Sequence, residues 1–316
     1  MQIFRSLSEI PADFGPSAVT IGKFDGVHAG HRAVIGRLET TARARSLTSV
    51  VVTFDRNPLA VLRPEMCPEN LVSNEQKLDL LAETGLDAAV MLTFDRELSA
   101  KPAQEFVKSI LVDALEARVV LAGADFRFGA GGVGTMGTLT DLGRDLGFEV
   151  LTMEEVRLSN DRRASSSWIR QLLAEGRVSE AAELLGRFPS VRGTVVHGEQ
   201  RGRALGYPTA NLSPELEGFI PADGVYAAWL TAGGVRYPAA VSVGNNPTFE
   251  GVPDKQIEAH ALDQRFDLYE QVVEVSFVEY IRGMVKFSGA EALSEQMTLD
   301  VEHIRSVLGV APQGSA

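Results

Sequence analysis

The sequence is poor in cysteine and in long apolar runs, and each shortage excludes a class of protein. Cys67 is the only cysteine in 316 residues, which excludes an intrachain disulfide and a cysteine-based metal cluster. No stretch approaches the roughly 18 consecutive apolar residues of a membrane-spanning helix. Residues 1–10 lack the apolar run of a secretory signal peptide, so we expect a cytoplasmic protein without a membrane partner.

Positive charge is also scarce. The chain carries 30 Lys and Arg against 42 Asp and Glu, a formal net charge of −12 at pH 7. This balance argues against nucleic acid as the main partner, but not against nucleotides, which local groups and metal ions can hold. A hydrophobic content of 45% is ordinary for a globular protein, and the length predicts two domains. Assembly into a homo-oligomer is left open.

The first half of the chain alternates short apolar runs with amphipathic helical patterns. Strands are expected at 18–21, 49–54, 88–93, 119–122 and 148–152. Helices are expected at 30–44, 74–84, 100–115 and 136–146, the second capped by Ser73 with Gln76 and the third by Ser99. This alternation predicts an α/β domain with a mostly parallel, doubly wound, Rossmann-like sheet. Two short helices, 166–174 and 179–185, follow, and 186–190 is expected to be a linker.

The second half is rich in Val, Ala, Ile and aromatic residues, with turn residues between the apolar runs. Strands are expected at 192–196, 225–230, 235–243, 256–262 and 272–280. They predict a closed or nearly closed antiparallel β-barrel. A final helix, 290–308, should pack on the barrel through Leu293, Met297, Val301, Ile304 and Leu308. We expect domains at 1–185 and 190–310, able to fold apart, so that a fragment beginning near Leu184 works alone.

The most informative stretch is 199–212, EQRGRALGYPTANL, where a glycine- and arginine-rich loop runs into Pro-Thr-Ala-Asn. If 207–212 is a strand, Thr209 and Asn211 point to the same face, because side chains alternate along a strand. A hydroxyl and an amide oxygen beside a loop of free backbone N–H groups suit a magnesium ion and the phosphates it carries. The alternative is an edge strand with two polar residues facing water.

A second motif lies at 18–31, AVTIGKFDGVHAGH, where a strand ends in a glycine-rich turn and a helix begins. The unpaired backbone N–H groups and the dipole of that helix favour an anion. His28 and His31 share one face and can balance charge on a phosphorus under attack. The alternatives are a zinc pair or two capping histidines. We expect a nucleotide site formed by Gly22, Phe24, Asp25, His28, Gly30 and His31, in which Gly30 leaves room for a base or ribose.

Three further segments should reach the same edge of a doubly wound sheet, where strands end and ligands bind. Asn57 follows the strand that ends at Phe54, and Asp125 lies in GADFRFG (123–129). The segment SSSWIR opens a helix whose hydroxyls and guanidinium can hold phosphate, and it supplies Ser165, Ser166 and Arg170. Each has a structural alternative: serines cap helices, and Phe126 and Phe128 can simply pack.

Glu258 lies in QIEAHALD, on the opposite face from Ile257, Ala259 and Ala261. A carboxylate at the mouth of a barrel can take the proton from an alcohol that attacks a phosphoryl group, although a solvent-facing glutamate fits the pattern equally well. His260 is expected at the surface or the barrel rim. Asn245, in SVGNNPTF, can bind the edge of a polar heterocycle or can serve only as a turn residue.

These motifs carry a specific likeness. The chain resembles the prokaryotic bifunctional riboflavin kinase/FAD synthetases over nearly its whole length, through IGKFDGVHAGH, GADFRFG and SSSWIR in the first half. GRALGYPTANL, GVYAAW, SVGNNPTF and IEAHALD extend the likeness through the second. The resemblance implies that a nucleotidyltransferase domain converts FMN and ATP to FAD, and that a flavokinase barrel converts riboflavin and ATP to FMN.

The resemblance also implies roles for single residues. Thr209 and Asn211 would bind Mg²⁺ and the ATP phosphates, Glu258 would be the catalytic base, and Gly198, Gly202 and Arg203 would line the phosphate loop. His28 and His31 would contact ATP, and Arg170 would close the serine-rich motif. One departure matters: the family usually has Pro-His-Pro where this chain has Arg56-Asn57-Pro58.

Two competing interpretations remain at this point. A different nucleotidyltransferase, such as a cytidylyltransferase, would explain the H-x-G-H motif but not the barrel. A flavin-binding protein without turnover would explain Asn57 but not the retention of Thr209, Asn211 and Glu258.

Overall fold

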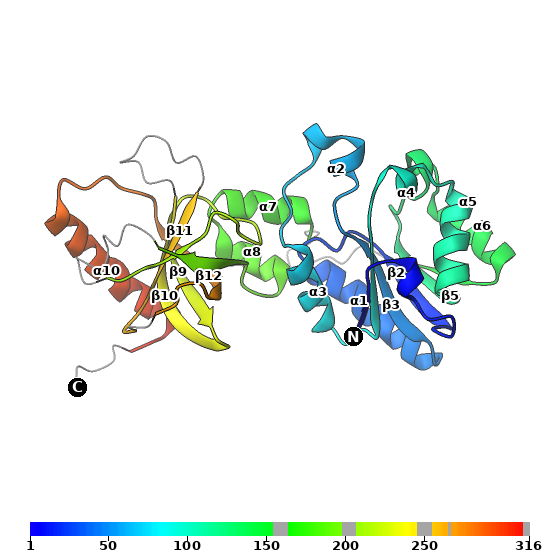
Figure 1. The fold of residues 1–316 in the computed structure, drawn as a ribbon, viewed down its shortest axis with the longest axis horizontal. Coiled ribbons are helices and arrows are strands. Elements are labelled where there is room, and N and C mark those ends of the chain that lie inside the picture. The colour runs from blue at the N-terminus through cyan, green and yellow to red at the C-terminus, as the bar shows by residue number, and fades with distance from the viewer. Residues whose placement is uncertain (154–163, 198–206, 245–254, 265–266, 312–316) are drawn as a thin grey trace. The chain divides into compact units, whose positions relative to one another are not determined.

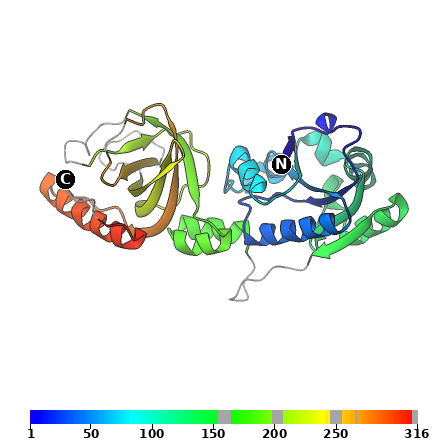
Figure 2. The same cartoon turned by 90° about the horizontal axis from the view of Figure 1, so that it is seen from below.

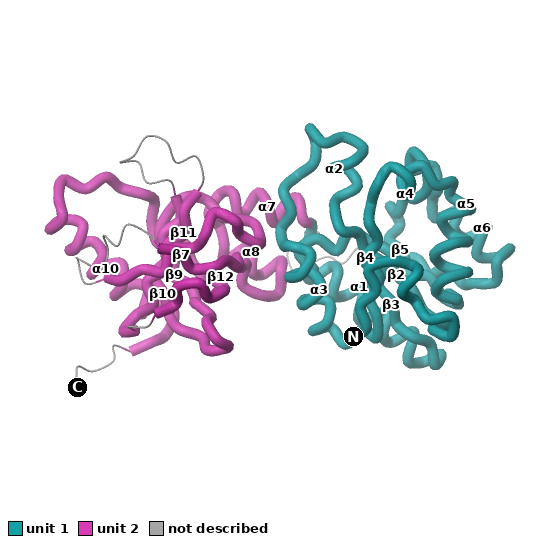
Figure 3. Tube along the Cα trace, viewed as in Figure 1, with its two compact units in different colours: residues 1–165 teal, residues 166–316 magenta. Residues whose placement is uncertain are grey.

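The computed structural model describes residues 1–153, 164–197, 207–244, 255–264 and 267–311. The chain forms two compact units, Met1–Ser165 and Ser166–Ala316 (Figure 3). In the described part of the chain, no helix is both long enough and apolar enough to cross a bilayer.

The first unit is built on a six-stranded sheet of order β1-β4-β3-β2-β5-β6 in which every neighbouring pair is parallel (Figure 1). Its strands are β1 (Gln2–Phe4), β2 (Ser17–Ile21), β3 (Thr48–Phe54), β4 (Ala88–Leu92), β5 (Ala117–Gly123) and β6 (Glu149–Met153). The predicted doubly wound sheet is confirmed. The prediction lacked β1, whose three residues are too few to show a period.

Helices cover both faces of this sheet. One core gathers Ile35 and Leu38 of α1 (Ala29–Ala44) and Leu78 and Leu81 of α3 (Asn74–Ala82) over Val51. The other core lies under the second helical layer, which consists of α5 (Ala103–Phe106), the π-helical segment η3 (Val107–Ala114) and α6 (Met136–Leu146). Val50 and Val52 face this second core, whereas Val51 faces the first. Consecutive side chains of β3 are therefore buried on opposite faces of the sheet, as expected for a parallel sheet that is covered on both faces. Figure 2 shows α1 running along one side of the sheet.

Of the two helix caps that the sequence predicts, one is present in the structure and the other is not. Ser73 and Gln76 form the predicted capping box of α3. The predicted Ser99 cap is wrong. Asp95 caps α4 (Arg96–Ala100) by accepting the Leu98 N–H at 2.8 Å, and Ser99 lies inside α4. Pro102 then separates α4 from α5, because proline has no N–H to continue a helix.

The strand order reverses beside β2, whose neighbours are β3 on one side and β5 on the other. In open α/β sheets, ligands bind outside the carboxyl ends of the strands at such a switch point. The loop after β2 (residues 22–28) and the loop after β5 (residues 124–129) therefore occupy the expected ligand edge.

The second unit contains a closed barrel with strand order β10-β11-β8-β7-β12-β9. The strands are β7 (Ser190–Val196), β8 (Ala210–Leu212), β9 (Gly224–Ala232), β10 (Val235–Gly244), β11 (Gln256–Ala261) and β12 (Val272–Arg282). The predicted antiparallel barrel is confirmed. However, β8 begins at Ala210 rather than Tyr207, since Pro208 has no N–H to donate to the ladder.

The last helix, α10 (Ala290–Leu308), lies along the outside of the barrel (Figures 1 and 2). Ile304 is fully buried with Val225 and Ala227 of β9, and Val301 and Leu308 pack beside it. The predicted packing face is confirmed at these three positions. Leu293 and Met297 lie in the N-terminal part of the helix and are not part of this cluster.

Two helices that the sequence analysis placed with the first domain pack with the barrel. They are α7 (Ser166–Ala174) and α8 (Val178–Leu185). The backbone N–H of Ala222 donates to the carbonyl of Leu173 at 2.9 Å, and α8 packs against β12. The predicted linker at 186–190 is therefore the connection between α8 and β7 within one compact unit.

This arrangement predicts which barrel fragment is stable. A fragment of residues 166–316 should unfold at least about 10 °C above one of residues 186–316. The shorter fragment loses the buried Val178, Leu184 and Leu185, each worth about 1.5–3 kcal/mol. Thermal unfolding followed by circular dichroism measures the difference. Equal midpoints would show that α7 and α8 add no stability to the barrel.

Candidate functional site

The first candidate site lies between β2 and α1, at the switch in strand order. His28 is buried and caps α1: its Nδ1 accepts the backbone N–H of His31 at 3.4 Å. The two imidazole rings stack with centroids 3.7 Å apart, and the Phe24 ring lies 5.0 Å from that of His31. The motif thus places both histidines together at a helix start, as predicted. Among the described residues, no group of three His, Cys, Asp or Glu is placed to hold a metal ion, so the zinc alternative lacks a third ligand there.

The loop that carries these histidines has an unusual backbone. Phe24 and Val27 both have positive φ, 47° and 39°, although neither is glycine, and both are buried. Non-glycine residues adopt this region rarely and hold it only where packing fixes the loop. A Cβ on Gly30 would lie 3.1 Å from Cε1 of His28, and one on Gly22 would lie 3.0 Å from the Phe24 ring. In this structure Gly30 makes room for the His28 ring. Its room for a base or ribose stays a prediction.

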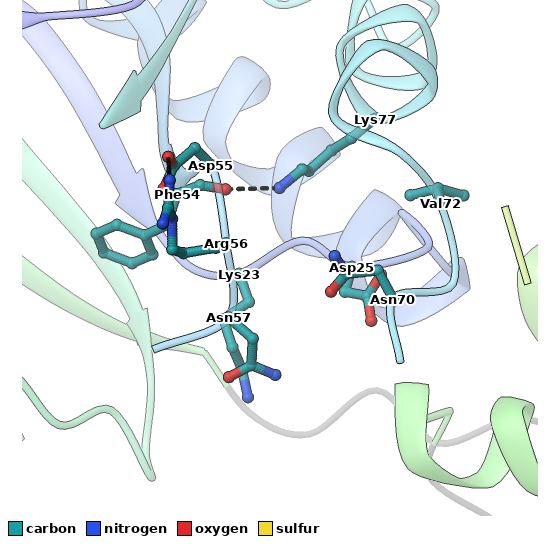
Figure 4. Close-up of a pocket in the computed structure, with 9 residues that line it drawn as sticks. All are labelled: Lys23, Asp25, Phe54, Asp55, Arg56, Asn57, Asn70, Val72 and Lys77. Atoms are coloured by element: carbon teal, nitrogen blue, oxygen red, sulfur yellow. Dashed lines mark hydrogen bonds and ion pairs between the residues drawn. The ribbon is translucent and has the colours of Figure 1, made fainter. Parts of the chain in front are cut away.

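A small polar pocket adjoins this loop at the carboxyl end of β3 (Figure 4). Its lining includes the predicted Asp25 and Asn57 together with two cations that the sequence analysis missed, Lys23 and Lys77. Lys77 is only 6% exposed, and its Nζ donates to the carbonyl oxygen of Phe54 at 2.7 Å. Burial lowers the pKa of the Lys77 ammonium, and the carboxylates of Asp25 and Asp55 act in the opposite direction. The sequence signal for Lys77 is its place four residues before the buried Leu81, on the inner face of α3.

Asp25 and Asn57 each fix the backbone around this pocket. Asp25 Oδ1 accepts the N–H of Leu71 at 2.9 Å, which ties the loop after β2 to the segment before α3. Asn57 is 9% exposed, and its Oδ1 accepts the N–H of Leu59 at 3.1 Å, at the start of α2 (Leu59–Leu62). Figure 4 shows the Asn57 amide beside the Lys23 side chain.

The remaining predicted residues of this site fall into two groups. Asp125 is exposed and lies in the turn after β5, whereas Phe126 and Phe128 stack at 5.4 Å and pack on the core, as the structural alternative held. Ser165 ends the first unit, and a Cβ on Gly30 would lie 3.7 Å from the carbonyl oxygen of the preceding Ala164. Ser166 and Arg170 belong to α7 of the second unit, so their approach to the histidines stays a prediction.

The second candidate site lies on the outer face of β8 and β11. The two strands pair antiparallel with Asn211 directly opposite Glu258. Directly paired residues project to the same face with their Cβ atoms about 4.5–5.5 Å apart. Thr209 Oγ1 donates to Oε2 of Glu258 at 3.4 Å, so a hydroxyl, an amide and a carboxylate gather here. All three side chains are half-buried, while Ile257, Ala259 and Ala261 are buried on the opposite face.

Other predicted residues of the barrel have different outcomes. His260 is only partly exposed, and its Nδ1 lies 2.8 Å from the carbonyl oxygen of Pro208. We expected a residue at the surface or the barrel rim and did not predict this contact. The remaining predicted positions, Gly198, Gly202, Arg203 and Asn245, lie outside the described residues.

Together these features define a class of protein. A parallel α/β unit with a histidine-capped helix at its switch point is a nucleotide-binding arrangement. A barrel that presents clustered hydroxyl, amide and carboxylate oxygens suits phosphoryl transfer from a metal-bound nucleotide. The chain is thus a two-unit nucleotide-dependent transferase.

Comparisons with known proteins make the assignment specific. Residues 10–167 match the FAD synthetase family and residues 185–308 match the riboflavin kinase family. The bifunctional riboflavin kinase/FMN adenylyltransferase of Escherichia coli K12 is 35% identical over 307 residues, 97% of this chain and 96% of that protein. Its counterpart in Listeria monocytogenes is 35% identical over 293 residues, 91% of each chain.

The chain therefore belongs to the family of bifunctional riboflavin kinase/FMN adenylyltransferases, with an FAD synthetase domain followed by a riboflavin kinase domain. A solved structure described as a macrolide-efflux protein from Streptococcus pneumoniae shares the fold. Its TM-score is 0.85 at 32% identity, covering 96% of this chain and 98% of that one.

Proposed function

We propose that the barrel phosphorylates riboflavin with Glu258 as the general base. The 5′-hydroxyl of riboflavin attacks the γ-phosphorus of ATP, the bond to the ADP oxygen breaks, and Glu258 takes the hydroxyl proton, which leaves FMN and ADP. The observation that carries this proposal is the clustering of Thr209, Asn211 and Glu258 on one face. A carboxylate within reach of the attacking hydroxyl supplies the proton acceptor that such a transfer needs.

The same cluster fits a magnesium ion. Mg²⁺ prefers oxygen ligands and usually keeps water and substrate phosphates in its coordination sphere, so one or two protein oxygens suffice. The Thr209 hydroxyl and the Asn211 amide oxygen are of this type, and they lie beside the Glu258 carboxylate. When bound with ATP, the ion would neutralise charge on the phosphates. Thr209 and Asn211 would orient the nucleotide, while Glu258 would be left to act on the alcohol.

The first unit would then adenylylate FMN. A phosphate oxygen of FMN attacks the α-phosphorus of a second ATP, the bond to the β-phosphate breaks, and FAD and pyrophosphate leave. His28 Nδ1 accepts the His31 N–H, so in the neutral ring the proton sits on Nε2. His28 would therefore present an N–H donor to the ATP phosphates. Preorganised donors of this kind stabilise charge that develops during transfer.

One assay tests both activities. The purified chain, incubated with riboflavin, ATP and MgCl₂, should form FMN first and FAD later, as followed by chromatography. Omission of Mg²⁺ with added chelator should stop both products. A chain that binds riboflavin but never forms FMN would instead be a flavin-binding protein.

Asn57→His should raise FAD synthesis by roughly tenfold, because it would place a ring donor beside Lys23. The Nδ1 of a histidine can accept the Leu59 N–H as the Asn57 oxygen does, which leaves its Nε2–H for the phosphate. The initial rate of FAD formation from FMN and ATP measures the effect, with riboflavin phosphorylation as the internal control. An unchanged or lower rate would remove Asn57 from the list of groups that contact phosphate.

A further inference from the structure

The segment that carries Thr209 has unusually little backbone support. β8 contains only three residues, Ala210–Leu212, and its ladder with β11 ends at the pair Ala210 and Ala259. Pro208 cannot extend the ladder, because it has no N–H. Thr209 therefore lies just outside the strand, although its hydroxyl needs a defined position to meet Glu258.

A side chain of the neighbouring strand supports this segment where the ladder ends. His260 Nδ1 lies 2.8 Å from the carbonyl oxygen of Pro208. A carbonyl oxygen only accepts, so Nδ1 carries the proton and donates. Burial lowers the pKa of His260, which favours the neutral ring with its single N–H directed at Pro208.

Two contacts thus hold consecutive residues of the Pro208–Thr209 pair to one strand. His260 and Glu258 are two residues apart on β11 and face the same way, since side chains alternate along a strand. His260 holds the carbonyl of Pro208, and Glu258 accepts the hydroxyl of Thr209 at 3.4 Å. The carbonyl that His260 holds belongs to the peptide bond between Pro208 and Thr209. The contact therefore restricts the orientation of the Thr209 backbone, and with it the position of the Thr209 side chain.

The last helix also contacts this segment. The Tyr207 hydroxyl lies 2.9 Å from Thr298 Oγ1 of α10, and the Tyr207 ring meets the His260 ring edge to face at 5.4 Å. Arg305 of α10 donates to Asp263 at 2.6 Å, just beyond β11. The Tyr207 ring and the Pro208 carbonyl thus restrict the His260 ring, so its N–H is aimed before any substrate binds.

We propose that His260 is a positioning residue of the riboflavin kinase site: by holding the Pro208 carbonyl it places Thr209 against Glu258 and the bound nucleotide. The inference rests on the proposed kinase function. His260 touches no reacting atom in this account and acts only through Thr209.

A matched pair of substitutions tests this role. His260→Phe keeps an aromatic ring beside Tyr207 but removes the donor, whereas His260→Asn places an amide N–H near the position of Nδ1. We expect His260→Phe to lower riboflavin kinase kcat about 10- to 100-fold and to raise the KM for Mg·ATP several-fold, as a misplaced binding group does. His260→Asn should recover most of both losses. FAD synthesis from added FMN serves as the control in the same chain.

The outcomes separate the two levels of the proposal. A His260→Phe protein with wild-type kcat and KM would overturn the positioning role, even while Glu258→Gln remained inactive. A lower kcat with an unchanged KM for Mg·ATP, not recovered by His260→Asn, would indicate a loss of folded protein and would also overturn it. If Glu258→Gln itself kept full kinase activity, the proposed kinase site would be the part that fails.

Discussion

Glu258→Gln is expected to lower riboflavin phosphorylation by about two to four decades, the range that follows loss of a general base. Glutamine keeps the size of the side chain and an oxygen that can accept the Thr209 hydroxyl, so the cluster of Thr209 and Asn211 should persist. The substitution removes only the ability to take a proton. Steady-state FMN formation at saturating riboflavin and Mg·ATP gives the ratio, and riboflavin affinity should change little.

A matched control makes this result specific. Glu279→Gln removes the same charge from an exposed position on β12 of the same barrel, and it should leave FMN formation unchanged. The Glu258→Gln protein should still convert added FMN to FAD. Full kinase activity in Glu258→Gln would assign the proton transfer to another group.

His31→Ala is expected to lower FAD synthesis by about two to three decades, as loss of one preorganised donor in a buried transfer site does. The substitution removes the ring that stacks on His28 with centroids 3.7 Å apart. The His28 ring, which would donate to the ATP phosphates, therefore also loses the contact that holds its orientation. The backbone N–H that His28 accepts is retained, so α1 should keep its cap. The rate of pyrophosphate release from FMN and ATP measures the loss.

The control for this prediction is an exposed histidine of the second unit that has no proposed role. His303 is exposed on α10, and His303→Ala should leave both activities at the level of the unmodified chain. The His31→Ala protein should phosphorylate riboflavin normally and accumulate FMN. FAD formation at the unmodified rate would mean that the H-x-G-H motif is not part of the adenylylation site.

The sequence predicted those features that local patterns encode. The alternation of Ile257, Ala259 and Ala261 with Glu258 correctly assigned the two faces of β11, because side chains alternate along any strand. The Ser73 capping box was readable because its two hydrogen bonds join residues three apart. The resemblance to a known family then predicted the two activities, because its motifs lie in both halves of the chain.

Features that depend on contacts between distant parts of the chain could not be predicted from local sequence patterns. Which residue faces Glu258 depends on the pairing of β11 with β8, and only the fold sets that register. The buried Lys77 was missed because its partner is a backbone carbonyl on β3, and His260 was underrated for the same reason at Pro208. The packing of α8 on β12 likewise gave no local signal, so the sequence alone did not show that α7 and α8 form one compact unit with the barrel.

The central claim is that one chain transfers two different phosphorus atoms of ATP to flavin, and isotopic labelling tests it most directly. Riboflavin and Mg·ATP are supplied to the purified chain with label on the γ-phosphorus in one reaction and on the α-phosphorus in another. The account predicts γ-label in both FMN and FAD, and α-label in FAD alone. α-Label in FMN, or consumption of ATP with no label in any flavin, would contradict it.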